Sequence, residues 1–292
     1  MDAVSAPLLA ATDLRLDEGA SVVVEGLTFE TQGDKVLVFG GSWPVLRAAL
    51  RELAPRRGAL LLGGHTPEHA ARASTVAIAP LDPPLPPELT PRAYIAWSAR
   101  LATTNAGLAR KRAAEALGAL GLEPVAGSPL GRCALTGRRA TVVAAALATG
   151  APALLVADPT AGLADDEARG FARILVKSLD NIRWALFAPR LALESPLALA
   201  ADEALVLGAS EVLAQGAPGD VAARERRFAM RVHGEAEAFA AALAARGFTT
   251  SGSPPRLFVE LTGSQGTRDL FALALEHRAI IVELSPVAGA LA

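Results

Sequence analysis

The stretch "VLVFGGSWPVLRAAL", residues Val36–Leu50, joins an apolar run to a helical pattern through two glycines. Four apolar residues in a row are typical of a buried strand that enters a glycine turn. Apolar residues at helical spacing begin within a few positions, so we predict a strand, a turn and a helix N-terminus. This is the layout of a phosphate-binding loop, but the lysine and the hydroxyl that such a loop needs are missing. By itself the stretch is equally compatible with a nucleotide site, the remnant of one, or a coincidence.

The composition is that of a globular protein, with 292 residues, 51% hydrophobic and 20% charged. This length suits one large domain or two modest ones. A net charge of −2 gives no electrostatic footprint for nucleic acid, so we expect no such partner. The single cysteine, Cys133, excludes an internal disulfide and is expected to be a small buried residue.

Neither a secretion signal nor a membrane span is predicted. The N-terminus carries acidic residues early and no basic segment before an apolar run. The longest apolar stretch, Thr141–Ala157, is interrupted by Gly150 and Pro152. It fits a helix, a turn and a buried strand better than a membrane helix. We therefore expect a soluble chain that is able to dock on a membrane protein.

Strand-like and helix-like segments alternate through the first 220 residues. The expected strands lie at residues 21–26, 35–40, 74–80, 184–189 and 203–208, and the stretch 152–163 is expected to be a buried strand that ends in a turn. One helix is expected at 44–54, with "PRRG" at 55–58 as its stop, and another at 165–179. Between about 81 and 135, a proline-rich loop leads into amphipathic helices at 93–102 and 110–122. The alternation predicts a parallel α/β sheet with a helical insertion.

A second unit is expected to begin near residue 225. Strand patterns occur at 227–234, 256–263 and 279–286, and helical patterns at 235–247 and 267–278. The segment "TTSGSPP", residues 249–255, is expected to be a loop. This β-α-β-α-β order predicts a small ferredoxin-like domain at 225–292, after a larger domain at 1–224.

The segments of the larger unit come in the order found in one known family. The quoted stretches are "GLTFETQGDKVLVFGGSWPVLRAALRELAPRRGALLLGGH" (26–65), "VAIAPLDPPLPPELTPRAYI" (76–95), "ALTGRRATVVAAALATGAPALLVADPTAGLADDE" (134–167) and "ADEALVLGASEVLAQGAPGDV" (201–221). From near residue 7 to about 222, the chain resembles the ATP-binding subunit of an ABC transporter. The resemblance implies a P-loop NTPase-like α/β fold with a helical subdomain at about 82–140. The tail from 225 resembles the C-terminal extension of ABC-2 type subunits, particularly those of the gliding-motility group.

The phosphate loop of this family, GxxxxGK[ST], wraps the phosphates with its glycines, lysine and hydroxyl. Gly40 stands at the first glycine and is followed by Gly41. Val45, Leu46 and Arg47 then stand at the second glycine, the lysine and the hydroxyl. An aliphatic side chain cannot replace an ammonium group against a polyphosphate, so this match is vestigial.

Two further residues bear on phosphate binding. Pro44 removes one backbone N–H that would otherwise be available to a phosphate. Arg47 or Lys35 can compensate for the missing lysine only by reaching the site from another direction.

The other nucleotide-contacting positions are also changed. Ala157 and Asp158 stand at the Walker B aspartate and glutamate, which hold the Mg²⁺ shell and polarise the attacking water. Asp158 is then either a solvated acid at a strand end or a remaining catalytic acid. Leu81 stands at the Q-loop glutamine and Pro189 at the switch histidine. We expect the four histidines at the surface, and residues 1–28 contain no aromatic side chain to stack on adenine.

The signature and D-loop positions are altered as well. Leu135, Thr136 and Gly137 begin the signature, and arginines follow directly. Thr136 and Gly137 either offer a hydroxyl and an N–H to a nucleotide held by a partner, or belong to a capped helix start with solvated arginines. In the D-loop, Ala164 replaces the usual aspartate.

Because these losses coincide, we predict a catalytically inactive subunit, a pseudo-ATPase with no cofactor and no metal. We expect a structural or regulatory role within an ABC-2-like membrane assembly for transport or motility. The resemblance implies a membrane permease as partner, bound in a groove between the Q-loop region and the helical subdomain to which residues 83–97 contribute. It also implies a homodimer, or a heterodimer with an ABC ATPase subunit, on the cytoplasmic face of the inner membrane.

Two alternatives remain open from the sequence. One is a functional ABC transporter ATPase with unorthodox motifs. The other is a soluble scaffold without a permease.

Overall fold

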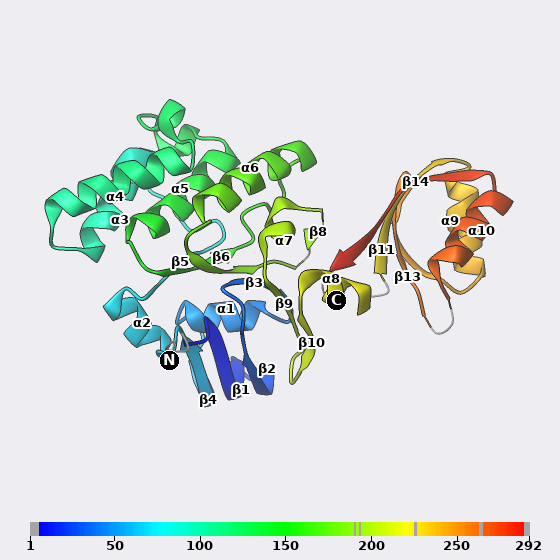
Figure 1. Ribbon diagram of the computed structural model, residues 1–292, viewed down its shortest axis with the longest axis horizontal. Helices are drawn as coiled ribbons and strands as arrows, with labels where there is room; N and C mark the ends of the chain where they lie inside the picture. Colours follow the sequence, from blue (N-terminus) through cyan, green and yellow to red (C-terminus); the bar gives the residue numbers. More distant parts are fainter. Residues whose placement is uncertain (1–5, 190, 193, 225–226, 263–264, 289–292) are drawn as a thin grey trace.

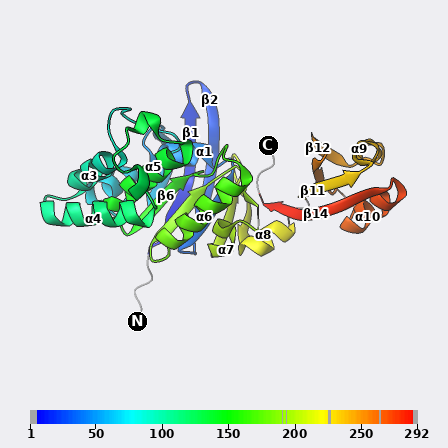
Figure 2. The same cartoon turned by 90° about the horizontal axis from the view of Figure 1, so that it is seen from above.

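The computed structural model describes residues 6–189, 191–192, 194–224, 227–262 and 265–288. It contains a large unit with two sheets and a smaller C-terminal unit with a third sheet (Figure 1). The helices α3 and α4 and the C-terminal unit lie at opposite ends of the molecule (Figure 2).

The central sheet has six strands in the order β10-β9-β3-β7-β6-β5. The strands are β3 (Lys35–Gly40), β5 (Val76–Ala79), β6 (Ala153–Ala157), β7 (Arg183–Phe187), β9 (Glu203–Leu207) and β10 (Val212–Gly216). All neighbours are parallel except β10, which pairs antiparallel with β9. The predicted parallel α/β sheet with intervening helices is thus confirmed, with one antiparallel edge strand. The strand expected at 21–26 does not belong to it, because these residues lie in β2 (Ser21–Glu30) of a separate antiparallel sheet.

A second, antiparallel sheet stands at the N-terminal side, in the order β2-β1-β4. It consists of β1 (Leu9–Glu18), β2 (Ser21–Glu30) and β4 (Pro55–Leu62). The expectation that "PRRG" at 55–58 only stops a helix is wrong, because these residues open β4 and pair with β1. The preceding helix α1 (Trp43–Ala49) already ends at Ala49. β1 was not expected from the sequence.

The helices of the large unit lie on the two sides of the central sheet. They are α1 (Trp43–Ala49), α2 (Pro67–Ala73), α3 (Pro91–Ala102), α4 (Ala106–Ala119), α5 (Leu135–Ala148), α6 (Asp165–Ser178), α7 (Pro196–Ala200) and α8 (Pro218–Arg224). Short 3₁₀ turns occur at Glu123–Val125 and Leu130–Arg132. The second predicted amphipathic helix begins earlier than expected, because Asn105 caps α4 by accepting a hydrogen bond from the backbone N–H of Leu108.

Side chains of β3 alternate between two hydrophobic cores. Val36 and Val38 pack with α1 and the N-terminal sheet, and Leu37 and Phe39 pack with α5 and α6. Because both faces of the sheet are covered, the strand reads as a continuous apolar run. Cys133 is buried, as expected.

The C-terminal unit has the order β-α-β-β-α-β, with β11 (Arg227–Gly234), α9 (Ala236–Ala245), β12 (Thr249–Ser253), β13 (Arg256–Glu260), α10 (Thr267–Glu276) and β14 (Ala279–Ala288). The sheet order β12-β13-β11-β14 with antiparallel neighbours is that of a ferredoxin-like unit. The helices α9 and α10 lie on the face turned away from the large unit (Figure 1).

The expectation of a loop at 249–255 is wrong for residues 249–253. These residues form β12, which makes a hairpin with β13 through Pro254 and Pro255. β12 is an edge strand that is mostly exposed, so it lacks the apolar alternation by which strands are recognised.

The predicted boundary between 224 and 225 falls at residues 225–226, which lie outside the described part of the chain. Strand pairing connects the two sides of this boundary. β8 (Leu191–Ala192), from the large unit, pairs antiparallel with the end of β14. The C-terminal sheet therefore includes a strand from the connection that follows β7.

No helix in the described ranges is long and apolar enough to span a membrane.

Candidate functional site

The predicted strand, turn and helix at Val36–Leu50 are present, and the turn between β3 and α1 is very short. Only Gly41 and Ser42 separate the two elements. The Gly41 N–H donates to the Leu207 carbonyl oxygen at 2.6 Å. Gly40 has φ +74°, and a Cβ at this position would lie 2.3 Å from the same oxygen. The turn is therefore held tightly against the end of β9, and only glycine fits at its start.

The helix occupies the positions where a phosphate loop would wrap its ligand. α1 begins at Trp43, and the Leu46 N–H donates to the Ser42 carbonyl oxygen at 3.0 Å. Val45 and Leu46 are fully buried against the N-terminal sheet. The Leu46 N–H is thus used inside the helix, and Pro44 has no N–H to offer a phosphate.

The two cations considered as replacements for the lysine, Arg47 and Lys35, form ion pairs elsewhere. The Arg47 guanidinium pairs with Glu18 at 2.6 Å and with Glu52 at 3.3 Å. Lys35 lies at the opposite end of β3 from Gly40, and its ammonium pairs with Asp180 at 3.3 Å. Neither side chain is available at the turn.

The Walker B position is buried. Ala157 ends β6 inside the core, and Asp158 is only 7% exposed. Burial raises the pKa of the Asp158 carboxyl, while Arg139 and hydrogen bonds from Thr160 and Ala161 act in the opposite direction. The interpretation of Asp158 as a solvated acid is therefore wrong.

The signature position opens α5. Leu135 is the first helical residue, and the cap residue, Ala134, offers no side chain to the helix. The Thr136 hydroxyl donates to Glu167 of α6, and the Gly137 carbonyl accepts from the Thr141 hydroxyl at 2.7 Å. The expectation of a capped helix start is therefore wrong.

The expectation of solvated arginines after the signature is wrong for Arg139, which is 7% exposed. Its Nε and Nη2 donate to the two oxygens of Asp82 at 3.0 and 2.8 Å. Its Nη1 donates to the carbonyl oxygens of Pro159, at 3.3 Å, and Ala161. The side-chain pairing with Asp82 lowers the pKa of that carboxyl.

Arg139 was missed because its partner lies 57 residues away in the chain. A signal was nevertheless present. The residues that follow it, 140–148, are almost all apolar, which is typical of a buried helix. A charged residue at the start of such a helix requires a partner.

The remaining positions come to the same edge of the central sheet. Gly40 is the last residue of β3, and Asp158 and Pro189 follow the carboxyl ends of β6 and β7, which lie beside it in the order β3-β7-β6. Leu81 follows β5 and is half-buried against the core around α1. Pro189 is exposed. The structure therefore gathers the predicted positions, but it presents apolar, buried or paired side chains there.

The residue after the D-loop position contacts the C-terminal unit. Ala164 is the cap residue of α6, and Asp165, which follows it, forms an ion pair with Arg256 of β13. A cleft of about 400 Å³ lies beside this pair, between α6 and the C-terminal sheet, and Arg169 and Phe258 are among its lining residues.

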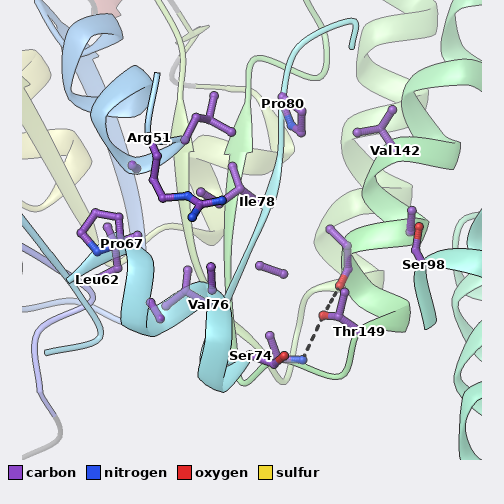
Figure 3. A pocket seen from close by; sticks show the side chains of 18 of the residues that line it. Arg51, Leu62, Pro67, Ser74, Val76, Ile78, Pro80, Ser98, Val142 and Thr149 are labelled. Carbon is purple, nitrogen blue, oxygen red and sulfur yellow. Dashed lines mark hydrogen bonds between the residues drawn. The ribbon is translucent and has the colours of Figure 1, made fainter. Parts of the chain in front are cut away.

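A groove of about 390 Å³ separates α1 and α2 from the helices α3 and α5 (Figure 3). Arg51, at the end of α1, lies across the groove from Val142 of α5, and β5 forms the floor with Ile78. Of the predicted stretch 83–97, the residues Pro83 and Tyr94 line this groove. The walls from α2, β5 and α5 were not predicted.

One edge of the groove carries exposed apolar side chains of α3. Tyr94 and Ser98 line the groove, and at 100° per residue Trp97 and Leu101 lie on the same side of the helix. Trp97 is 54% exposed and Leu101 is 70% exposed. Two large apolar side chains on the groove side of α3 are therefore in contact with solvent.

Comparisons with known proteins agree with this architecture. No family model matches the chain. The Nod factor export ATP-binding protein I of Ralstonia nicotianae is 30% identical over 228 residues, which cover 76% of this chain and 70% of that protein.

Solved structures show the fold. The structure of cbiO1 from Clostridium perfringens, part of the ABC transporter complex cbiONQ, has a TM-score of 0.64 at 19% identity and covers 75% of this chain and 91% of that one. A bacterial Atm1-family ABC exporter with ATP bound has a TM-score of 0.58 at 21% identity, over 76% of this chain and 40% of that one. From this fold and the 30% identity to the Ralstonia protein, the chain belongs to the family of ABC transporter ATP-binding subunits.

Proposed function

We propose that this chain is a pseudo-ATPase, an ABC-type subunit that neither hydrolyses nor tightly binds ATP. The observation that carries the proposal is the place of Leu46. It stands at the lysine position of the phosphate loop, inside a helix that begins at Trp43, and is 1% exposed. The lysine position thus holds a buried aliphatic side chain instead of an ammonium group, and Pro44 removes one N–H donor from the turn.

The Walker B region supports the same conclusion. Catalysis by this family's chemistry needs a metal-binding carboxylate and a second acid that polarises water. Here Ala157 replaces the first, and the buried Asp158 lies near the Arg139 guanidinium. The positive charge that acts on Asp158 is thus the Arg139 guanidinium, where the family's chemistry would use a metal ion.

The test is nucleotide-dependent thermal stabilisation. A ligand at a hundred times its dissociation constant stabilises a protein by about 2.7 kcal/mol. We expect no change in Tm of the purified chain with millimolar Mg-ATP, whereas the Ralstonia relative serves as the positive control in the same buffer. A saturable shift in this chain would overturn the proposal and favour the alternative, a functional ATPase with unorthodox motifs.

We further propose that the chain is a structural or regulatory component of an ABC-2-like assembly for export or motility. The groove between α1, α2, α3 and α5 and its exposed edge at Trp97 and Leu101 suit a helical, partly apolar segment of a membrane permease. This role implies a peripheral position on the cytoplasmic face of the inner membrane. It also implies a homodimer, or a heterodimer with an intact ABC ATPase subunit.

The remaining alternative, a scaffold without a permease, predicts no membrane association. Fractionation of cells that natively contain the chain separates the two. Recovery with the membranes supports docking on a permease, and recovery only in the soluble fraction favours the scaffold. The division into units at 1–224 and 225–292 and the likeness of the second to ABC-2 extensions belong to the same proposal.

A further inference from the structure

Arg139 connects three segments that are far apart in the sequence. It belongs to α5, it pairs with Asp82 in the loop after β5, and it donates to the carbonyls of Pro159 and Ala161 in the loop after β6. We call this arrangement of Arg139, Asp82 and the two carbonyls the Arg139 clasp.

Most of the hydrogen-bond donors of the Arg139 guanidinium are used in the clasp. A guanidinium has five N–H donors in a rigid plane, and four hydrogen bonds from Arg139 are present. The two bonds to Asp82 form a bidentate pair, which fixes direction as well as distance. By contrast, the neighbouring Arg138 is only half-buried and reaches the Cys133 carbonyl at 3.5 Å.

The three segments meet around Asp158 and the groove. Asp158 lies directly before Pro159, and Pro83, next to Asp82, lines the groove with Val142 of α5. A buried cation that has carbonyl and carboxylate partners on two loops keeps both loops at a fixed distance from the helix, because any displacement leaves a buried charge without partners.

We propose that the Arg139 clasp holds α5 and the loops after β5 and β6 in one arrangement without any ligand. The contacts of Arg139 thus hold α5 and the two loops together at this edge of the sheet, as contacts with a bound molecule would do. It goes beyond the proposed loss of ATPase activity, because it concerns the resting arrangement of the loops whether or not nucleotide binds.

The test is amide hydrogen exchange of the full chain without nucleotide, on wild type and R139M. We expect exchange in residues 81–85 and 158–163 to become faster by about tenfold or more in R139M. Exchange in the N-terminal sheet, β1, β2 and β4, should stay as in wild type. We also expect Tm to fall by a few degrees, because the Asp82 carboxylate that is left behind is 48% exposed and stays hydrated.

R138M is the matched control, since it removes the same charge from the neighbouring position. Equal effects of R138M and R139M, or an unchanged loop after β6 in R139M, would overturn the proposal. If R139M does not fold, D82N provides the milder test, with faster exchange in the same two loops as the expected result and unchanged exchange as the contrary one. A Mg-ATP shift in wild type would overturn the proposed function but would leave these measurements unaffected.

Discussion

Arg256 of β13 forms an ion pair with Asp165, the first residue of α6, across 91 residues of sequence. The pair lowers the pKa of Asp165 through a side-chain hydrogen bond from the guanidinium. It joins the helix that follows the D-loop position to the sheet of the C-terminal unit. Both side chains are more than half exposed, so solvent and salt screen the interaction.

Substitution of Arg256 by Gln should loosen the start of α6. An exposed ion pair contributes about 0.2–1 kcal/mol, so hydrogen exchange in the first turn of α6 should become faster by up to about fivefold at low salt. The matched control is R246Q, which removes a similarly exposed pair with Glu276 inside the C-terminal unit. An equal change at α6 in both variants would show that the Arg256 pair does not join the two units.

The substitution G40A should destabilise the fold by about 3 kcal/mol or more. The added Cβ would lie 2.3 Å from the Leu207 carbonyl oxygen, at a φ of +74°. G121A is the control, because Gly121 has a φ of +65° but no atom near its missing Cβ. It should cost only the backbone strain of about 1–2 kcal/mol. Urea unfolding measures both, and equal losses would mean that the turn does not depend on this close contact.

Restoring the family lysine should not restore nucleotide binding. In L46K an ammonium group replaces a side chain that is 1% exposed, so we expect a loss of about 3 kcal/mol or more in unfolding free energy. Tm should remain independent of Mg-ATP. W43K, at a position that is 42% exposed on the same helix, should be tolerated. An L46K protein with wild-type stability and a nucleotide-dependent Tm would show that a phosphate site persists.

Stability should depend on the ionisation of Asp82. Its folded pKa is lowered by Arg139, so its contribution is present above the ordinary value of 3.8 and is lost as the pH falls through the lowered pKa. D82N, which cannot ionise, should be less stable than wild type by about 1 kcal/mol or less at pH 7, because the Asp82 side chain is 48% exposed and solvent screens the pair. Urea unfolding at a series of pH values should show this difference shrinking below pH 3.8. A difference that does not change with acidification would contradict the pairing.

Filling the groove should weaken membrane association. In S98R a long charged side chain replaces a small one that lines the groove between α3 and β5. The fraction of the chain that sediments with native membranes should fall severalfold if the permease docks there. The control is L199R on α7, where the native leucine is 76% exposed and does not line the groove. An equal loss in both variants would assign the effect to general misfolding or to charge.

Much of the fold could be predicted from the sequence, because buried parallel strands produce continuous apolar runs such as Val36–Phe39. Exposed strands give no such signal, so the sequence "TTSGS" of β12 predicts a loop instead of a strand. The start of α1 can be predicted from the sequence, because proline in the first turn, here Pro44, is typical of a helix N-terminus.

The site was harder to predict than the fold. The motif positions could be located by their order, but the state of each side chain depends on partners brought together by folding. The sequence alone predicts Arg138 and Arg139 as two solvated arginines, whereas folding brings Asp82 and the Pro159 and Ala161 carbonyls to Arg139 and buries it. Asp158 was misjudged for the same reason, since its burial depends on the packing of the loop after β6 and not on its neighbours in sequence.

The pairing of β8 with β14 has a consequence for biosynthesis. Ala192 pairs with Val287, so the partner of this short strand is made about 95 residues later. At about 5–20 residues per second, a ribosome needs roughly 5–19 s to produce it. The strands of the central sheet are all translated before that time. The connection after β7 is therefore completed late, and a nascent chain interrupted in this interval would expose β8 without its pairing strand.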